Sequence, residues 1–163
     1  MTQDIKRILY ATDLSENSAH AFGYAINLAN KFDAEITILH VIDRMMDISV
    51  NMVGVYVNEK EFEGNFQKGI THITEEINNR LKKFIDKKVG DNPESAGIVV
   101  SIEICQGYPA DEIIKQADDL HCDLIVMGTH GKGIVSQAFF GSVAKRVLRR
   151  VRKPVFIVPL PEE

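Results

Sequence analysis

The most informative part of the chain is a glycine pattern, Gly128-Thr129-His130-Gly131 followed after nine residues by Gly141-Ser142. The apolar run before it predicts a buried strand that leads to Gly128, and the residues after Ser142 have the spacing of a helix. Ser142 offers a hydroxyl where the first N–H groups of that helix lack an intrahelical partner. Glycines allow close approach of the backbone, and free N–H groups with the helix dipole favour negative charge. We therefore expect a phosphate site at this joint, although each glycine taken alone could serve only a turn.

The rest of the chain alternates between apolar runs and helical patterns. Continuous apolar runs are typical of strands in a parallel sheet that helices cover on both faces. No segment rich in Gly, Ser or Pro divides the chain, and 163 residues suit one domain. The order predicts a single-domain, doubly wound α/β fold with five strands. We expect strands over 5–11, 34–42, 98–105, 123–128 and 154–159, and helices over 18–32, 59–89, 109–120 and 143–151.

Composition excludes several classes of protein. The apolar share of 45% and the charged share of 26% are those of a globular domain, and the net charge of −4 argues against a surface that binds nucleic acid everywhere. No run reaches the roughly 18 apolar residues of a membrane span, and the first residues lack the layout of a signal peptide. Cys105 and Cys122 flank apolar runs without metal-site spacing, so we expect buried free thiols and a cytoplasmic protein.

Three segments are expected at the carboxyl ends of the strands, where folds of this type bind ligands. Thr12 and Asp13 follow the first strand, Val41 lies near the end of the second, and the glycine loop follows the fourth. Asp13 could accept hydrogen bonds from a ribose or help to hold a hydrated metal ion; capping the first helix is an equally good reading. Val41 could offer backbone hydrogen bonds to a base, or it could simply be a strand residue.

The sequence VMGTHGKGIVSQAFFGSVAKRVLRRVRKPVFIVP (126–159) resembles the C-terminal signature of the universal stress protein family. It is most similar to the ATP-binding subgroup, whose motif is G-x2-G-x9-G followed by Ser or Thr. ILYATDLSENSAHAFGYAINLA (8–29) and GYPADEIIKQADDLHCDLIVMG (107–128) resemble other parts of the family, so the likeness covers nearly the whole chain. The resemblance implies a Rossmann-like sheet of strand order 3-2-1-4-5, homodimers, and regulators of the stress response that bind ATP.

The resemblance also implies a role for individual residues. Asp13 would contact the ribose, Val41 the adenine through its backbone, and the motif glycines the ribose and phosphates. The positions expected to bind ATP, with or without Mg²⁺, are Thr12, Asp13, Val41, Met127, Gly128, His130, Gly131, Lys132, Gly141, Ser142 and Val143.

Catalysis is a separate question from binding. His130 and Lys132 could neutralise phosphate charge, and His130 could shuttle a proton; a loop histidine that bonds to phosphate or solvent is the simpler reading. The chain has no GxxxxGK[ST] loop, no GxGxxG spacing and no HIGH signature. We therefore expect binding without efficient turnover and name no catalytic residue. A slow ATPase or phosphotransferase, or an interaction module that works without nucleotide, remains an alternative.

Two further segments carry no assigned role. Residues 145–153 hold six basic residues and no acidic one, which leaves 13 basic against 23 acidic residues in the rest of the chain. This run could attract an anionic partner, although a solvated helix face is the more common meaning. The Met-rich segment Met45–Val57 could cover the nucleotide, bind a partner or pack beside the second helix. The apolar final strand Val155–Val158 should not stay exposed at a sheet edge, which predicts a homodimer through this strand.

Overall fold

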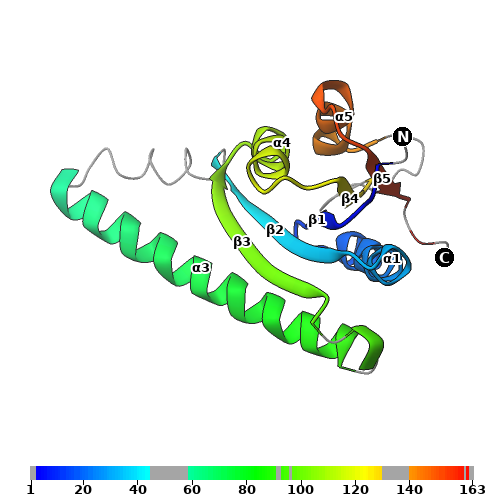
Figure 1. The fold of residues 1–163 in the computed structure, drawn as a ribbon. Helices are drawn as coiled ribbons and strands as arrows, with labels where there is room; N and C mark the ends of the chain where they lie inside the picture. The colour runs from blue at the N-terminus through cyan, green and yellow to red at the C-terminus, as the bar shows by residue number, and fades with distance from the viewer. Residues whose placement is uncertain are drawn as a thin grey trace.

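The computed structural model describes residues 3–44, 59–90, 93–95, 97–129, 140–159 and 161, without the side chains of residues 59–67 and 93. The Met45–Val57 segment therefore lies outside the described residues. Figure 1 shows the elements in chain order. They are β1 (Arg7–Ala11), α1 (Glu16–Phe32), β2 (Glu35–Asp43), α3 (Glu59–Val89), the 3-10 turn η2 (Pro93–Ser95), β3 (Val99–Gly107), α4 (Pro109–Asp119), β4 (Leu124–Gly128), α5 (Ser142–Arg150) and β5 (Val155–Val158).

The five strands form one parallel sheet in the order β3-β2-β1-β4-β5, which confirms the expected fold. β1 is the central strand, and it pairs Ala11 with Leu39 of β2 and Tyr10 with Val126 of β4. Ile8, Leu9 and Tyr10 have no exposed surface. Both faces of the central strand are covered, so its apolar run is continuous rather than alternating.

Helices form a layer on each face of the sheet. α1 and α3 cover one face, and α4 and α5 cover the other (Figure 1). Successive β1 residues point to opposite layers: Ile8 and Tyr10 join the core beneath α1 and α3, while Leu9 and Ala11 join the core beneath α4 and α5. The helix that follows β1 and the helix that follows β4 therefore lie on opposite sides, so the direction of winding reverses between these two strands.

Most element ends lie within two residues of those expected from the sequence. α3 has the bounds that its periodicity predicts, and α1 begins two residues before the expected start. α1 starts there because Ser15 is its N-cap: the Ser15 side chain accepts a hydrogen bond from the backbone N–H of Ser18. Asp33 ends α1 in the left-handed conformation, with φ 52°. None of the helices in the described part of the chain is both long enough and apolar enough to cross a membrane.

Candidate functional site

The segments after β1, β2 and β4 meet at the carboxyl edge of the sheet. The backbone N–H of Thr12 donates to the carbonyl oxygen of Leu39 at 2.9 Å, which holds the end of β1 against β2. Extending each register by two residues beyond its last pair brings Asp13 level with Val41 and Thr12 level with Gly128. This edge, between β1 and β4, is where open α/β sheets bind ligands.

The turn after β1 is fixed by side-chain hydrogen bonds. Thr12 Oγ1 accepts from the backbone N–H of Leu14 at 3.0 Å and from the hydroxyl of Ser18 at 2.5 Å. Asp13 Oδ1 accepts from both the backbone N–H and the hydroxyl of Ser15, at 3.0 and 2.5 Å. Leu14 is held in the left-handed region, with φ 66°. These contacts correct the alternative that Asp13 caps α1, because Ser15 is the cap and Asp13 orients Ser15.

Residues beneath the turn extend this network, and the sequence reasoning missed them. Tyr10 Oη donates to the carbonyl oxygen of Ser18 at 2.6 Å, and burial raises the pKa of Tyr10, so its hydroxyl stays protonated as a donor. His40 Nδ1 lies 2.8 Å from the carbonyl oxygen of Thr12. The signal available in the sequence was a polar residue inside each of two apolar patterns: Ser18 on the buried face of α1 and His40 within β2.

Val41 presents its backbone to the space beyond the end of β1. In a parallel ladder, one residue directs both its N–H and its C=O to the same neighbouring strand, and this direction repeats every second residue. The carbonyl of Leu39 points toward β1, where it accepts from Thr12, so the backbone groups of Val41 point to the same side. β1 has ended by that level, since its last paired residue is Ala11. The position suits recognition of a flat ligand edge by backbone hydrogen bonds.

The exit from β4 lies close to the beginning of α5. The backbone N–H of Gly141 donates to the carbonyl oxygen of Thr129 at 2.7 Å. The backbone N–H of Thr129 in turn donates to the carbonyl oxygen of Val158 at 2.9 Å. Gly141, rather than the expected Ser142, is the N-cap of α5, and among the described residues no side chain caps this helix. The first-turn N–H groups of α5, beginning with Ser142 and Val143, therefore have no capping side chain from the described part of the chain, and a helix start of this kind favours an anion.

The structure thus brings together seven of the expected site residues in the β1, β2, β4 and α5 segments. They are Thr12, Asp13, Val41, Gly128, Gly141, Ser142 and Val143. Met127, the eighth, is buried beneath this edge at the end of β4 and packs in the core under α4 and α5. His130, Gly131 and Lys132 lie outside the described residues. Within the described part of the chain, no group of three or more His, Cys, Asp or Glu side chains could hold a metal ion.

A hollow lies between this turn and α3. It has a volume of about 200 Å³ and separates the Thr12–Ser15 turn from α3, with Leu81 and Phe84 among its walls. Arg80 of α3 donates to the carbonyl oxygen of Leu14 at 3.3 Å. α3 therefore supports the turn from outside, so the conformation of the turn depends on packing between distant parts of the chain.

The two cysteines are free, as expected. Cys122 is buried and Cys105 is half-buried. Burial and the neighbouring Glu112 raise the pKa of the Cys105 thiol to about 11, and burial also raises the pKa of Cys122. Both thiols are therefore protonated near neutral pH, which suits a structural role better than a nucleophilic one.

Comparison with known proteins agrees with the resemblance seen in the sequence. The sequence profile of the universal stress protein family matches residues 4–159. Universal stress protein MJ0531 of Methanocaldococcus jannaschii is 35% identical over 97% of this chain and 84% of its own length. The solved structure of MJ0577, a universal stress protein of the same organism, has a TM-score of 0.74 at 31% identity and covers 99% of this chain and 100% of that one.

A more distant solved structure shares the fold. It is a universal stress protein in complex with cAMP, with a TM-score of 0.56 and 19% identity, covering 96% of this chain and 98% of that one. The family match spans nearly the whole sequence, and the strand order agrees with the structure. The chain belongs to the universal stress protein family.

Proposed function

We propose that this chain is an ATP-binding regulatory protein of the stress response, which binds nucleotide at the carboxyl ends of its strands. The observation that carries the proposal is the meeting of three segments between β1 and β4: the Thr12–Ser15 turn, the end of β2 and the start of α5. The family member in complex with cAMP supports an adenine nucleotide as the ligand. We propose one nucleotide-binding domain over residues 1–163, in a cytoplasmic protein.

Each part of ATP matches the chemistry of one segment. The carboxylate of Asp13 suits a ribose hydroxyl, because a charged acceptor makes a strong hydrogen bond. The backbone of Val41 suits the edge of adenine, and the uncapped start of α5 suits the phosphates. The positions proposed to contact ATP are Thr12, Asp13, Val41, Met127, Gly128, His130, Gly131, Lys132, Gly141, Ser142 and Val143.

The described residues fit a nucleotide better than they fit a metal cofactor of the protein itself. Mg²⁺ is commonly held by one or two carboxylates together with substrate phosphates. Asp13 is the carboxylate that the turn holds at this edge. Mg²⁺ would therefore arrive with ATP, and Asp13 is the side chain proposed to approach it. We propose binding without efficient turnover.

Calorimetric titration with ATP tests the proposal. Asp13→Ala removes one charged acceptor, which is worth about 1.5–3 kcal/mol, so affinity should fall on the order of 10- to 150-fold. Asp33→Ala is the matched control, because it removes an exposed carboxylate that lies between α1 and β2 at the opposite edge of the sheet. Equal affinities in the wild type and Asp13→Ala would refute the assignment of Asp13.

Two other measurements separate binding from the alternatives. Mass spectrometry of the small molecule that copurifies identifies the nucleotide directly; no copurified nucleotide and no thermal shift with ATP would favour an interaction module. Release of phosphate from ATP well above background, lost in Asp13→Ala, would show an ATPase instead.

We also propose a homodimer through β5. β5 is an edge strand, and it has the sequence Val155-Phe156-Ile157-Val158. Phe156 is 37% exposed and lies beside Tyr24 of α1, which is 42% exposed, with ring centroids 6.1 Å apart. Pairing with a second copy would cover this edge and its aromatic side chains.

A further inference from the structure

We propose that the solvent-facing side of α5 is a docking surface for an acidic helical segment of another protein. The surface, called the basic face below, consists of Lys145, Arg146 and Arg149 of α5 and of Arg152, which follows the helix; all four are exposed. This proposal is independent of the nucleotide site, since it concerns side chains that point away from the sheet.

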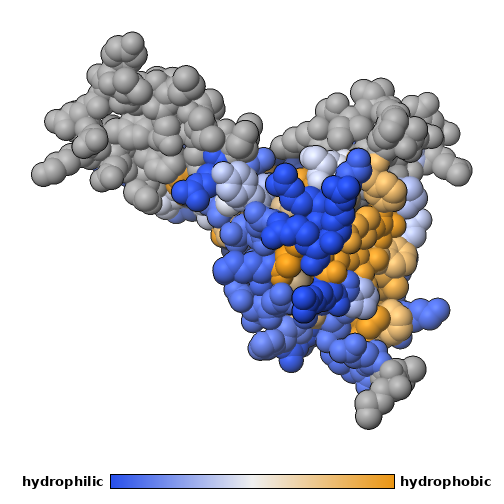
Figure 2. All heavy atoms as spheres, turned by 90° about the horizontal axis from the view of Figure 1, so that it is seen from above, coloured by the Kyte–Doolittle hydropathy of each residue, from blue (hydrophilic) through white to orange (hydrophobic). Residues whose placement is uncertain are grey.

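α5 packs on the sheet through one side and presents its cations on the other. Ala144 and Val147 are buried, at 2% and 0% exposure. At 100° per residue, Lys145, Arg146 and Arg149 fall on the side opposite to these two residues. Figure 2 views the molecule from the side of α4 and α5, where hydrophilic side chains gather over the helices beside a hydrophobic area.

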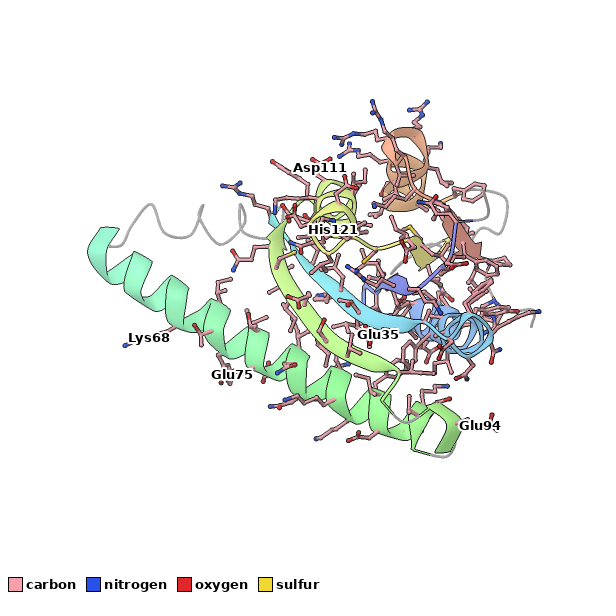
Figure 3. The ribbon with its side chains drawn as sticks, in the orientation of Figure 1. Glu35, Lys68, Glu75, Glu94, Asp111 and His121 are labelled. Carbon is pink, nitrogen blue, oxygen red and sulfur yellow. The ribbon has the colours of Figure 1, made fainter. Side chains whose placement is uncertain are left out.

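The cations of the basic face differ from their neighbours in the ion pairs that the described residues form. Two other cations of the run are paired with α4: Arg150 with Asp111, which Figure 3 labels, and Lys153 with Asp118 at 3.5 Å. Within the part of the chain that the structure describes, none of the four residues of the basic face forms an ion pair. The face is thus a bounded cluster of positive charge, with carboxylates along its α4 side.

Helix stability does not explain all of these cations. Arg149, in the last turn of α5, interacts favourably with the negative end of the helix dipole. Lys145 and Arg146 lie near the beginning of the helix, where a positive charge is unfavourable or neutral, and the first turn holds no acidic residue. The charge on this end of α5 therefore needs an explanation outside the helix.

The charge of the whole chain favours an acidic partner at this face. Without the run 145–153, the chain has 13 basic and 23 acidic residues, so the remaining charge, apart from a second basic stretch at 80–88 in α3, disfavours an acidic partner. Complementary fields of this kind set orientation and raise the rate of association. α5 is therefore one of two described elements on which such a partner meets attraction, and the C-terminal part of α3 is the other, which makes α3 the comparison for an effect specific to α5.

The dimensions favour a polypeptide helix over a nucleic acid. α5 has nine residues and is about 13.5 Å long, which is the length of a few turns of a partner helix. Lys145 and Arg149 are four residues apart, and carboxylates four residues apart on a partner helix have the same spacing of one turn. A duplex that extended across this face would pass onto α4, where the ion pairs of Asp111 with Arg150 and of Asp118 with Lys153 offer no net positive charge to its phosphates.

Fluorescence anisotropy tests the proposal with a labelled helical peptide that carries glutamates one turn apart. The same peptide with glutamine in place of glutamate, and a labelled DNA duplex, are the comparison probes. The glutamate peptide should bind more tightly than either, and its affinity should fall as salt concentration rises, because screening weakens exposed charges.

Variants show whether the binding is at α5. Arg149→Glu with Arg152→Glu should weaken peptide binding by at least about tenfold, since two attractions become repulsions. Lys82→Glu with Lys87→Glu is the matched control, because it makes the same change in charge at exposed positions of α3 and should have little effect. Arg149→Gln with Arg152→Gln guards against an effect of the glutamates on folding, and it should give an intermediate loss.

Three results would overturn the proposal. Equal losses in the α5 and α3 variants would mean that only net charge matters. Equal binding of the glutamine peptide would exclude an acidic partner. Tighter binding of the duplex than of the peptide, lost in the α5 variants, would assign the face to nucleic acid instead.

Discussion

Replacing Thr12 by Val tests how the turn after β1 is held. Valine has nearly the shape of threonine but lacks Oγ1, the atom that accepts hydrogen bonds from Leu14 and Ser18. The Ser18 hydroxyl has another partner within reach, because its oxygen lies 3.2 Å from the hydroxyl of Tyr10. The backbone N–H of Leu14 loses the acceptor that stabilises its left-handed conformation.

The expected loss of stability comes from the Leu14 N–H, because the Ser18 hydroxyl has a second partner and the Leu14 N–H loses its acceptor. A buried or half-buried donor left without an acceptor costs about 1–3 kcal/mol, so Thr12→Val should lower the free energy of unfolding by about that amount. The turn also positions Asp13. If the substitution disorders the turn, nucleotide binding has to order it again, and this ordering reduces the affinity. If binding has to supply the whole of this free energy, about 1–3 kcal/mol, ATP affinity falls about 5- to 150-fold.

Urea unfolding and calorimetric titration with ATP measure the two effects. Thr12→Ser is the control, since it keeps the hydroxyl and removes one methyl group, which costs about 0.8 kcal/mol through lost burial. It should retain ATP affinity near that of the wild type. Equal stability and equal ATP affinity in the Val and Ser variants would show that Oγ1 does not hold the turn.

Three further predictions concern other parts of the molecule. Asp33→Gly should raise the free energy of unfolding, measured in urea, by about 0.5–1 kcal/mol, because glycine adopts the left-handed C-cap conformation of α1 without strain. A variant less stable than the wild type would mean that the Asp33 side chain contributes more stability than the strain removes. In the Cys122→Ser variant, iodoacetamide should alkylate Cys105 slowly at pH 8, and the rate should rise up to about pH 11, because the raised pKa keeps the thiol protonated. An alkylation rate that levels off near pH 9.0, the ordinary pKa of a cysteine, would contradict this prediction. Phe156→Ser should convert the proposed dimer to monomer in sedimentation, because it removes an exposed ring from the β5 edge; an unchanged mass would locate the contact elsewhere.

The fold was predictable wherever the pattern of apolar residues carries the information. The continuous apolar runs around Ile8–Ala11 and Leu124–Met127 predict central parallel strands, and the periodicity of 59–89 predicts α3 with its observed bounds. The strand order came from the family resemblance, because apolar runs alone do not say which strands are neighbours. The start of α1 differed by two residues because the decisive contact, between Ser15 and Ser18, depends on the geometry of the turn.

The candidate site was predictable in its segments but less so in its contacts. Spacing indicated that Asp13, Val41 and the start of α5 belong to one edge, and the registers bring these segments together. The roles of Thr12 and His40 were not predictable, since their hydrogen bonds join residues 6 and 28 positions apart in the chain. The contact between Thr12 and Ser18 requires the turn to fold back on α1, and the contact between Thr12 and His40 requires the sheet to bring the end of β1 against β2.

If the proposed dimer forms through β5, the position of this strand at the sheet edge sets the number of binding surfaces in the assembly. Two identical strands that pair in a continuous sheet run antiparallel about a twofold axis perpendicular to that sheet, so such an assembly closes at two copies. This axis keeps both α5 helices on the same side of the extended sheet. Two basic faces would then lie next to each other, and a partner with two acidic segments could engage both at once. Its second attachment would be intramolecular, so the dimer would retain such a partner far longer than either copy alone.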